Sequence, residues 1–243
     1  MTGIYKLAGL IISISSLYKE VHIMCAAYRA DPEDGAPVFE VSTAKADVER
    51  EREKQAREDA FEGLPVQEYS DEYLETLAVY RKIAEKLPFF NCFLFHGSVV
   101  AVNGKGYLFT AKSGTGKSTH TRLWRELLGE AAFMINDDKP FLCVKEGETL
   151  VYGTPWDGKH HLSRNASVPL KAVCLLQRSE ENWIREITKT EALPMLLQQA
   201  YRPADPMSLS LTLQLIDSLS NRFYSLGCNT DISAAQLAWQ TMQ

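Results

Sequence analysis

The chain has 243 residues, of which 45% are hydrophobic and 23% are charged, and its net charge at pH 7 is −5. This length and composition are typical of a soluble globular protein with room for a large buried core. Lysine and arginine are spread along the chain and form no basic stripe, so we discount nucleic acid as a partner.

The cysteine pattern bears on the compartment of the protein. The five cysteines are scattered, odd in number and form no C-x-x-C pair: Cys25, Cys92, Cys143, Cys174 and Cys228. This arrangement argues against a disulfide framework and against a zinc site, and it favours a reducing compartment. Cys92, Cys143 and Cys174 lie in apolar runs, where we expect small buried thiols.

Residues 1–88 are expected to form a small N-terminal β-rich region that also contains helices. The pattern predicts strands at Ile4–Ser15, Val21–Tyr28 and Val38–Val41. The stretch Leu7–Leu17 is apolar, but it is rich in β-branched residues, interrupted by serines and too short to cross a bilayer. A strand is therefore favoured there over an export signal, and we expect no membrane partner.

Two helices are expected in the rest of this region. Residues 44–60 are almost entirely Ala, Glu, Lys, Arg and Asp, which predicts a helix with little apolar face and solvated charges. Glu62–Gln67 contains glycine and proline and reads as a connector. Asp71–Leu87 has apolar residues at spacings of three and four, which predicts an amphipathic helix that packs on a core.

From Phe89 onward the pattern is that of a βαβ nucleotide-binding domain, over residues 89–243. Strands are predicted at Phe93–Phe95, Ser98–Val102, Tyr107–Thr110, Ala131–Asn136, Phe141–Val144, Thr149–Tyr152 and Ala172–Leu176. Helices are predicted at Lys117–Leu128 and at about 190–201, 206–223 and 232–241.

A P-loop motif joins the strand Tyr107–Thr110 to the helix that begins at Lys117. It reads Ala111-Lys112-Ser113-Gly114-Thr115-Gly116-Lys117-Ser118 and is followed by Thr119, with alanine in place of the usual first glycine. In this context backbone N–H groups and the helix N-terminus can bind a polyphosphate. We predict that residues 113–119 bind ATP, with Lys117 on the β- and γ-phosphates and Ser118 on Mg²⁺.

Two adjacent carboxylates follow the next strand. Asp137 and Asp138 end a hydrophobic run about twenty residues after Lys117, a position at which a carboxylate faces a metal–phosphate site. One of the two can hold Mg²⁺, directly or through water, while the other accepts a proton from an attacking hydroxyl. The sequence leaves open which carboxylate has which role.

Two further segments can reach the same place. His96 precedes a hairpin that returns into the P-loop strand, so it is expected beside the phosphates. The polar loop Thr154–Ala166 can close over a substrate, with Lys159 or Arg164 stabilising charge on the transferred phosphate. His160 and His161 have no third ligand at metal spacing, so we do not propose zinc there.

The stretch FHGSVVAVNGKGYLFTAKSGTGKSTHTRLW…MINDDKPFL resembles HPr kinase/phosphorylase and the related phosphoenolpyruvate carboxykinases. In that superfamily a histidine-bearing strand, a hairpin, the P-loop and an Asp-Asp pair follow in this order. The resemblance implies an α/β fold with a mixed-sheet P-loop core. It also implies that Lys117 and Ser118 hold phosphate and Mg²⁺, that Asp137 and Asp138 supply the base and a metal-linked carboxylate, and that His96 lies by the transferred phosphate.

The resemblance has limits that affect the substrate. Thr119 stands where HPr kinases usually have glutamate, and the segment by which those enzymes engage their protein substrate is not found. Carboxykinases are about twice as long and have further site residues. The chain looks more like the small HPr-kinase-like proteins found beside peptide-modification genes, some of which phosphorylate peptides or small hydroxylated molecules. HPr kinases commonly form hexamers, so a homo-oligomer is compatible with the resemblance.

The leading hypothesis is a cytoplasmic, ATP–Mg²⁺-dependent kinase that phosphorylates a hydroxyl of a small molecule, peptide or small protein. A second hypothesis is a carboxykinase- or phosphorylase-like enzyme acting at the same site. A third is a nucleotide-binding accessory protein without turnover, which recognises a peptide through its N-terminal strands.

Overall fold

The structure is a computed structural model that describes residues 1–61, 63, 65 and 67–243. Residues 62, 64 and 66, in the predicted connector Glu62–Gln67, lie outside the described residues. The described chain divides into two compact units, Met1–Lys86 and Leu87–Gln243. Within that described part, no helix is both long enough and apolar enough to span a membrane.

The N-terminal unit contains a small sheet in the order β1-β2-β3. β1 (Thr2–Leu7) and β2 (Leu10–Ser15) are antiparallel, while β3 (Phe39–Ser42) pairs with β2 in parallel. The strand predicted at Ile4–Ser15 is therefore two strands. Ala8 and Gly9 both have positive φ, 52° and 75°, and this left-handed pair turns the chain into a hairpin.

The prediction of a strand at Val21–Tyr28 is wrong. The segment forms a short helix, α1 (Glu20–Met24), and a 3₁₀ turn, η1 (Ala26–Tyr28), and a second turn, η2 (Pro32–Asp34), follows. Its buried side chains are Val21, Cys25 and Tyr28, at spacings of four and three. Those spacings are helical, but a short apolar run of this length fits a strand as well, which explains the error.

The two predicted helices of this unit are confirmed as α2 (Lys45–Phe61) and α3 (Asp71–Lys86). The charges of α2 are not all solvated, however, because Asp47 and Glu51 are buried. Arg81 on α3 donates to Glu51 at 2.9 Å, and Lys82 donates to Asp47 at 2.8 Å. α2 therefore packs on α3 partly through ion pairs, although other charged side chains of this helix, such as those of Glu53 and Arg57, are exposed.

The C-terminal unit is a mixed α/β domain built on one sheet. Along the sheet the order is β4-β8-β9-β10-β6-β5-β7, with β12 also paired to β10 and β11 paired to β12. The strands are β4 (Cys92–Leu94), β5 (Ser98–Val102), β6 (Lys105–Thr110), β7 (Ala132–Asn136), β8 (Phe141–Lys145), β9 (Glu148–Tyr152), β10 (Ser167–Arg178), β11 (Trp183–Ile187) and β12 (Arg222–Cys228). β6, β10 and β12 run parallel, while β5 is antiparallel to both β6 and β7.

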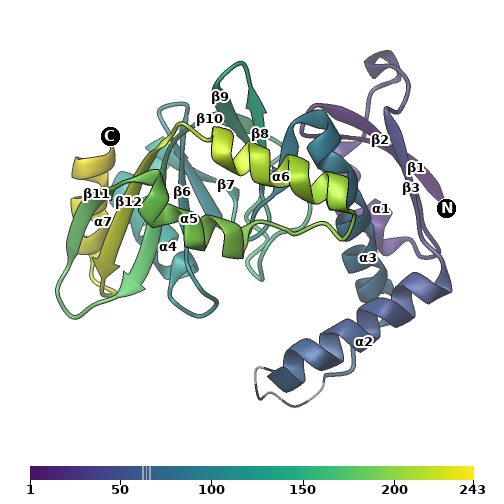
Figure 1. Ribbon diagram of the computed structural model, residues 1–243, viewed down its shortest axis with the longest axis horizontal. Coiled ribbons are helices and arrows are strands. Elements are labelled where there is room, and N and C mark those ends of the chain that lie inside the picture. Colours follow the sequence, from purple (N-terminus) through teal and green to yellow (C-terminus); the bar gives the residue numbers. More distant parts are fainter. Residues whose placement is uncertain (62, 64, 66) are drawn as a thin grey trace. The chain divides into compact units, whose positions relative to one another are not determined.

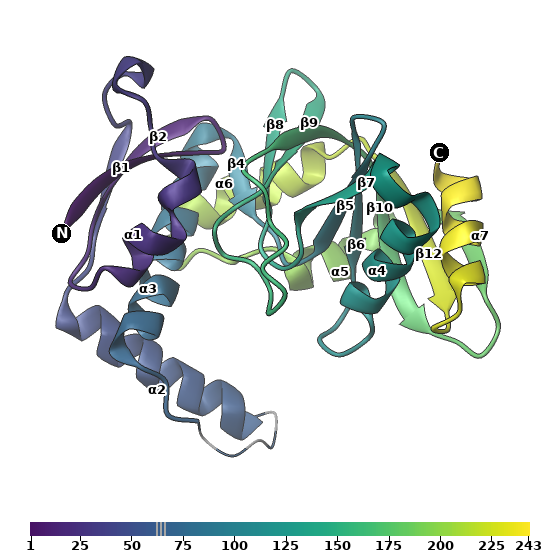
Figure 2. The same ribbon diagram turned by 180° about the vertical axis from the view of Figure 1, so that it is seen from behind.

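Helices cover both faces of this sheet. α5 (Lys189–Gln199) and α6 (Pro206–Ser218) lie on one face, and α4 (Lys117–Leu128) and α7 (Ile232–Met242) lie on the other (Figures 1 and 2). The alternation along β6 fits this arrangement: Leu108 joins the cluster under α5 and α6, while Tyr107 and Phe109 pack with Trp124 of α4. Two 3₁₀ turns, η3 (Leu87–Phe90) and η4 (Gly129–Ala131), complete the unit.

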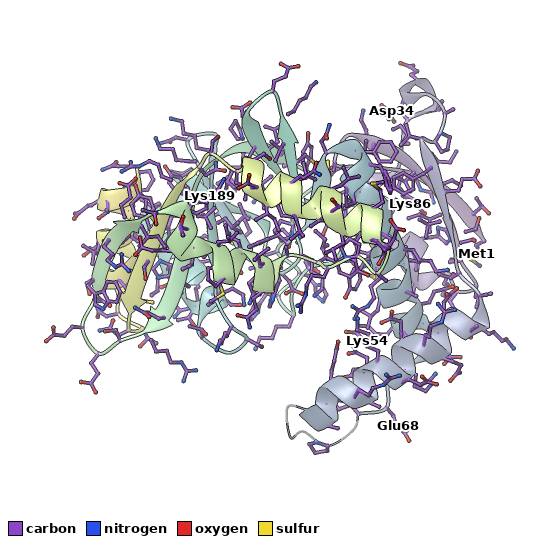
Figure 3. All side chains as sticks on the ribbon, in the orientation of Figure 1. Met1, Asp34, Lys54, Glu68, Lys86 and Lys189 are labelled. Carbon is purple, nitrogen blue, oxygen red and sulfur yellow. A yellow bond between two sulfur atoms is a disulfide. The ribbon has the colours of Figure 1, made fainter. Side chains whose placement is uncertain are left out.

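The end of the chain differs from the prediction in two elements, because β11 (Trp183–Ile187) was not predicted either. The helix predicted at 206–223 stops at Ser218, and the next apolar run forms the unpredicted strand β12, which pairs with β11 and β10. Leu219 is buried at the end of the helix, so the apolar pattern runs on from helix into strand without a break. Lys189 on α5 donates to the carbonyl oxygens of Asp217 and Leu219 and so joins this corner to α5 (Figure 3).

A disulfide between Cys92 and Cys143 corrects the expectation of free thiols at these positions. The two residues are directly opposite on the antiparallel strands β4 and β8, with 4.0 Å between their Cα atoms. Their separation of 51 positions hid this pairing in the sequence. The cysteine pattern therefore no longer argues for a reducing compartment. Cys25 and Cys174 are buried free thiols.

Candidate functional site

Three strand ends meet at one edge of the mixed sheet. β6 and β7 both run antiparallel to β5, so their carboxyl ends lie beside the amino end of β5. The loop after β6, the Asp-Asp pair after β7 and His96 before β5 are thereby brought to the same edge. The hydroxyl of Thr110 donates to the carbonyl oxygen of His96 at 3.0 Å and fixes the approach of these two ends.

The glycine-rich loop, residues Ala111–Gly116, leaves its inner surface open. Gly114 and Gly116 have φ values of +72° and +122°, and a Cβ atom at either position would meet nothing within 4 Å. α4 begins directly after the loop at Lys117, so its first N–H groups face the same space. A helix N-terminus that follows a loop of small residues is suited to an anion, because its first N–H groups lack intrahelical acceptors.

Lys117 folds back over the loop that precedes it. Its ammonium donates to the carbonyl oxygen of Ala111 at 3.3 Å. Burial lowers the pKa of Lys117, with the charge of Asp138 opposing this shift and that of Lys139 adding to it. The two neighbours place Lys117 within electrostatic reach of the strand end that carries the Asp-Asp pair.

Asn136 holds this strand end in place, and sequence reasoning missed it. Its side chain is fully buried, and its amide Nδ2 donates to the carbonyl oxygen of Thr154 at 3.2 Å. Its Oδ1 accepts from the backbone N–H groups of Asp138 at 2.8 Å and Lys139 at 2.6 Å. The signal that could have found it is an asparagine at the end of an apolar run, directly before two acids, because asparagine side chains commonly bond the backbone two residues on.

Asp138 belongs to a small cluster of charges. Its Oδ1 lies 3.2 Å from Nε2 of His96, and its Oδ2 accepts from the ammonium of Lys139. Burial alone would raise the pKa of Asp138, but the hydrogen bond from His96 and the charge of Lys139 outweigh it and hold the pKa well below its usual range. Asp138 is therefore ionised at any ordinary pH, and it lies beside His96 and within electrostatic reach of Lys117.

Asp137 lies in a different environment from its neighbour. Its Oδ1 accepts from the backbone N–H of Gly158 at 2.8 Å. A Cβ on that glycine would come within 2.8 Å of Oδ2, so only glycine allows the loop to pack this closely. Burial raises the pKa of Asp137 and the nearby carboxylate of Asp157 raises it further, although the Gly158 hydrogen bond lowers it. The adjacent carboxylates therefore differ in their affinity for a proton.

The remaining predicted residues are placed as follows. Ser113 and Ser118 are exposed on the open side of the loop and at the start of α4, and Thr115 and Thr119 are half-buried. Arg164 lies along β7, with its guanidinium 4.8 Å from the ring centroid of Phe133 and its backbone N–H bonded to Ile135. Lys159 is exposed on the loop that covers Asp137. Neither cation lies in the cluster around Asp138 that the preceding contacts define.

The fold and these contacts define a mixed α/β protein with a glycine-rich loop and two unlike carboxylates at one sheet edge. A family model described as "SynChlorMet cassette protein ScmC" matches residues 65–214, more than half of the chain. The chain therefore belongs to the ScmC family. No curated protein matches the sequence.

Among solved structures, the HPr(Ser) kinase/phosphatase from Coxiella burnetii aligns with 60% of this chain and 94% of its own, at 10% sequence identity and a TM-score of 0.36. A likeness at this level gives no information on activity. The function must be inferred from the residues of the site itself.

Proposed function

We propose that this protein is an ATP- and Mg²⁺-dependent kinase that transfers the γ-phosphate to a hydroxyl group. The observation that supports the proposal is that Asp138, paired with His96, lies within electrostatic reach of Lys117, whose ammonium is bonded to the glycine-rich loop. A cation over an anion cradle, beside a permanently ionised carboxylate, is the arrangement that phosphoryl transfer needs. The acceptor is a small molecule, a peptide or a small protein.

The residues present fit both nucleotide and metal. The open space at Gly114 and Gly116 gives the phosphates room to approach the backbone, and Lys117 would bind the β- and γ-phosphates. Ser118 and Asp138 would hold Mg²⁺, which usually takes one or two carboxylates and completes its shell with phosphate and water. Among the described residues no ready-made cluster of three or more metal ligands occurs, which is compatible with such a shared shell. When bound, the ion would neutralise charge on the β- and γ-phosphates.

The unlike carboxylates suggest a division of roles that the sequence left open. A raised pKa makes Asp137 the better proton acceptor, whereas Asp138 stays ionised and suits a metal. In the proposed step the acceptor oxygen forms a bond to the γ-phosphorus as the bond to the β–γ bridging oxygen breaks. The hydroxyl proton goes to Asp137 and ADP leaves. His96 stays bonded to Asp138 and orients it.

The test uses purified protein with γ-labelled ATP, Mg²⁺ and a lysate of its source cells. The key variant is Lys117→Ala, and the matched control is Lys112→Ala, which removes an exposed lysine from the same loop. Asp137→Ala and Asp138→Ala are run in parallel. We expect label on an acceptor with wild type and Lys112→Ala, and a loss of several orders of magnitude with the other three. Separation of proteins from small molecules then identifies the class of acceptor.

Equal labelling by Lys117→Ala and wild type would overturn the proposal. Nucleotide binding with no label on any acceptor would favour the accessory-protein hypothesis instead. A reaction that depends on inorganic phosphate or oxaloacetate would favour the phosphorylase- or carboxykinase-like hypothesis.

A further inference from the structure

The disulfide between Cys92 and Cys143 lies on the strand pair that leads to two contacting residues of the candidate site. β4 and β8 are antiparallel neighbours in the sheet (Figure 2), with Cys92 directly opposite Cys143. His96 lies shortly after Cys92 in the chain, and Asp138 lies shortly before Cys143. The two chain segments are therefore joined by a covalent bond at one end and by the contact between His96 and Asp138 at the other.

Backbone hydrogen bonds continue the pairing of these segments up to the site. The N–H of Phe95 donates to the carbonyl oxygen of Pro140 at 3.1 Å, and the N–H of Gly97 donates to that of Asp138 at 3.0 Å. Between these two bonds, Nε2 of His96 lies 3.2 Å from Oδ1 of Asp138. The register that the disulfide fixes is thus the register in which His96 meets Asp138.

The segment that bears His96 also has a neighbour on its other side. The N–H of His96 donates to the carbonyl oxygen of Gln199 at 2.8 Å, away from the segment that follows β7. The N–H groups of three successive residues therefore alternate between two neighbours: those of Phe95 and Gly97 bind the Asp138 side, and that of His96 binds the Gln199 side. Only the first two hold this segment against Asp138.

The position of β4 makes the covalent bond important for this contact. β4 is three residues long and stands at the end of the strand order, next to β8. A short edge strand has few backbone bonds to its neighbour, so it opens locally more easily than a central strand. A disulfide prevents the two strands from separating where it links them. Without it, the segment of His96 can remain with Gln199 while it parts from Asp138.

We propose that the Cys92–Cys143 disulfide is a positioning element of the candidate site, and that its reduction by a dithiol uncouples His96 from Asp138 and lowers phosphate transfer. The effect on transfer rests on the proposed function, whereas the effect on the His96–Asp138 contact does not. Both cysteines are buried, so the reductant reaches them during local opening of the edge strand.

The redox step is an ordinary thiol–disulfide exchange. A thiolate of the dithiol attacks one cysteine sulfur, the S–S bond breaks, and the other cysteine leaves as a thiolate that takes up a proton. The second thiol of the reductant then attacks the mixed disulfide and releases the first cysteine. Two electrons and two protons pass to the protein, which gains two thiols, and the dithiol becomes a cyclic disulfide.

The first experiment measures amide hydrogen exchange by NMR in the oxidised protein and after reduction with dithiothreitol, under conditions in which both forms are folded. We expect the N–H groups of Phe95 and Gly97 to exchange faster after reduction by about tenfold or more, because their acceptors lie on the Asp138 side. The N–H of His96, which donates to Gln199, is the internal control and should keep its rate. Unchanged rates at all three, or an equal increase at all three, would overturn the inference.

The second experiment measures the affinity for AMP-PNP by calorimetry, with and without Mg²⁺. Asp138 is proposed to act through the metal, so a displaced Asp138 should matter only when Mg²⁺ is present. We expect reduction to weaken AMP-PNP binding about tenfold with Mg²⁺ and to leave it unchanged without Mg²⁺. Cys92→Ser should bind as the reduced protein does under both conditions. Cys25→Ser, which removes a buried free thiol, should respond to the reductant as wild type does.

A further variant separates positioning from a general loss of stability. Val173→Ala creates a cavity at a fully buried position of β10, a strand that β9 separates from β8. It should be less stable than wild type and should still bind AMP-PNP more tightly with Mg²⁺ than without it, by the wild-type factor. Loss of that factor in Val173→Ala would overturn the positioning role of the disulfide.

The outcomes distinguish this inference from the proposed function. If wild type binds no AMP-PNP, the proposed function fails, and the exchange experiment alone decides whether the disulfide holds His96 against Asp138. If AMP-PNP binds, and reduction changes neither the exchange of Phe95 and Gly97 nor the Mg²⁺-dependent affinity, the proposed function stands and this inference is wrong. If Cys92→Ser does not fold, the reduction of wild type, with Cys25→Ser as its control, gives the same comparison.

Discussion

Nε2 of His96 lies 3.2 Å from Oδ1 of Asp138, although the two residues belong to different segments of the chain. The contact exists because the amino end of β5 and the carboxyl end of β7 are neighbours in the sheet, and because Gly97 N–H also donates to the carbonyl oxygen of Asp138 at 3.0 Å. The His96 side chain and the Gly97 N–H therefore both hold Asp138 in place. Asp138 thus contributes to the stability of this sheet edge as well as to the candidate site.

The first prediction concerns the acid stability that Asp138 provides. Its pKa is lower in the folded protein than the value of about 3.9 in the unfolded chain, so its contribution is complete above that value and is lost as pH falls toward the folded pKa. We expect Asp138→Asn to be about 1–3 kcal/mol less stable than wild type at pH 7, with a difference that shrinks below pH 4. Urea unfolding at pH 7 and pH 3 measures this, and a difference that does not depend on pH would contradict it.

The second prediction concerns Asp137, for which the sign is reversed. Its folded pKa is raised by burial, so ionisation costs stability as pH rises through the window between the unfolded and the folded pKa. We expect Asp137→Asn to be more stable than wild type at pH 7, with no gain at pH 3. Phosphate transfer should fall about 10²–10⁴-fold because the proton acceptor is lost.

The two neighbouring variants control for each other in this test. Both replace an aspartate with asparagine at the same turn, and both are expected to lose transfer, but their stability should change in opposite directions at pH 7. Thermal unfolding and transfer assays on the pair measure both quantities. A loss of stability in both variants would show that the two carboxylates share one environment, contrary to the contacts described here.

The positions of the glycine-rich loop, of α4 and of the two aspartates could be predicted from the sequence, because each depends on a local pattern. The loop Ala111–Gly116 and α4 are contiguous, so a strand, small residues and a helical pattern were enough to locate them. Asp137 and Asp138 were found for the same reason, since they end an apolar run. The hairpins at Asn103 and Gly147 were likewise marked by residues that accept a positive φ.

The features that sequence reasoning missed depend on contacts between distant segments. The difference between Asp137 and Asp138 comes from Gly158 on one side and from His96 and Lys139 on the other, and no local pattern reports it. The strand β12 was read as the end of a helix because its pairing with β10 is made across more than forty residues. Local periodicity cannot report such a pairing.

The third prediction concerns the disulfide between Cys92 and Cys143. It closes a loop over 51 positions, which stabilises the folded state by about 2–4 kcal/mol through the unfolded chain. We expect a reductant to lower the urea midpoint of wild type and to leave the Cys92→Ser variant unchanged. Cys25→Ser, which removes a buried free thiol, is the control and should respond to the reductant as wild type does. Equal response of Cys92→Ser and wild type would contradict the disulfide.

The fourth prediction concerns Asn136, the buried residue that shapes the turn of the two acids. Asn136→Ala removes the acceptor of the Asp138 and Lys139 N–H groups and leaves them unpaired. We expect a loss of about 2–4 kcal/mol in unfolding free energy and a clear loss of phosphate transfer, because Asp138 is no longer held toward His96 and Lys117.

The matched control for this loss is Asn221→Ala. Asn221 is a half-buried asparagine whose amide also donates to a backbone carbonyl, that of Leu170, but it lies directly before β12. Asn221→Ala should have a lower unfolding free energy than wild type. At a temperature at which both proteins are folded, it should transfer phosphate at the wild-type rate. If both variants lose phosphate transfer only in proportion to their loss of stability, Asn136 has a structural role alone. If Asn136→Ala loses transfer and Asn221→Ala does not, the turn positions Asp138, because only Asn136→Ala leaves the N–H groups of Asp138 and Lys139 without their acceptor.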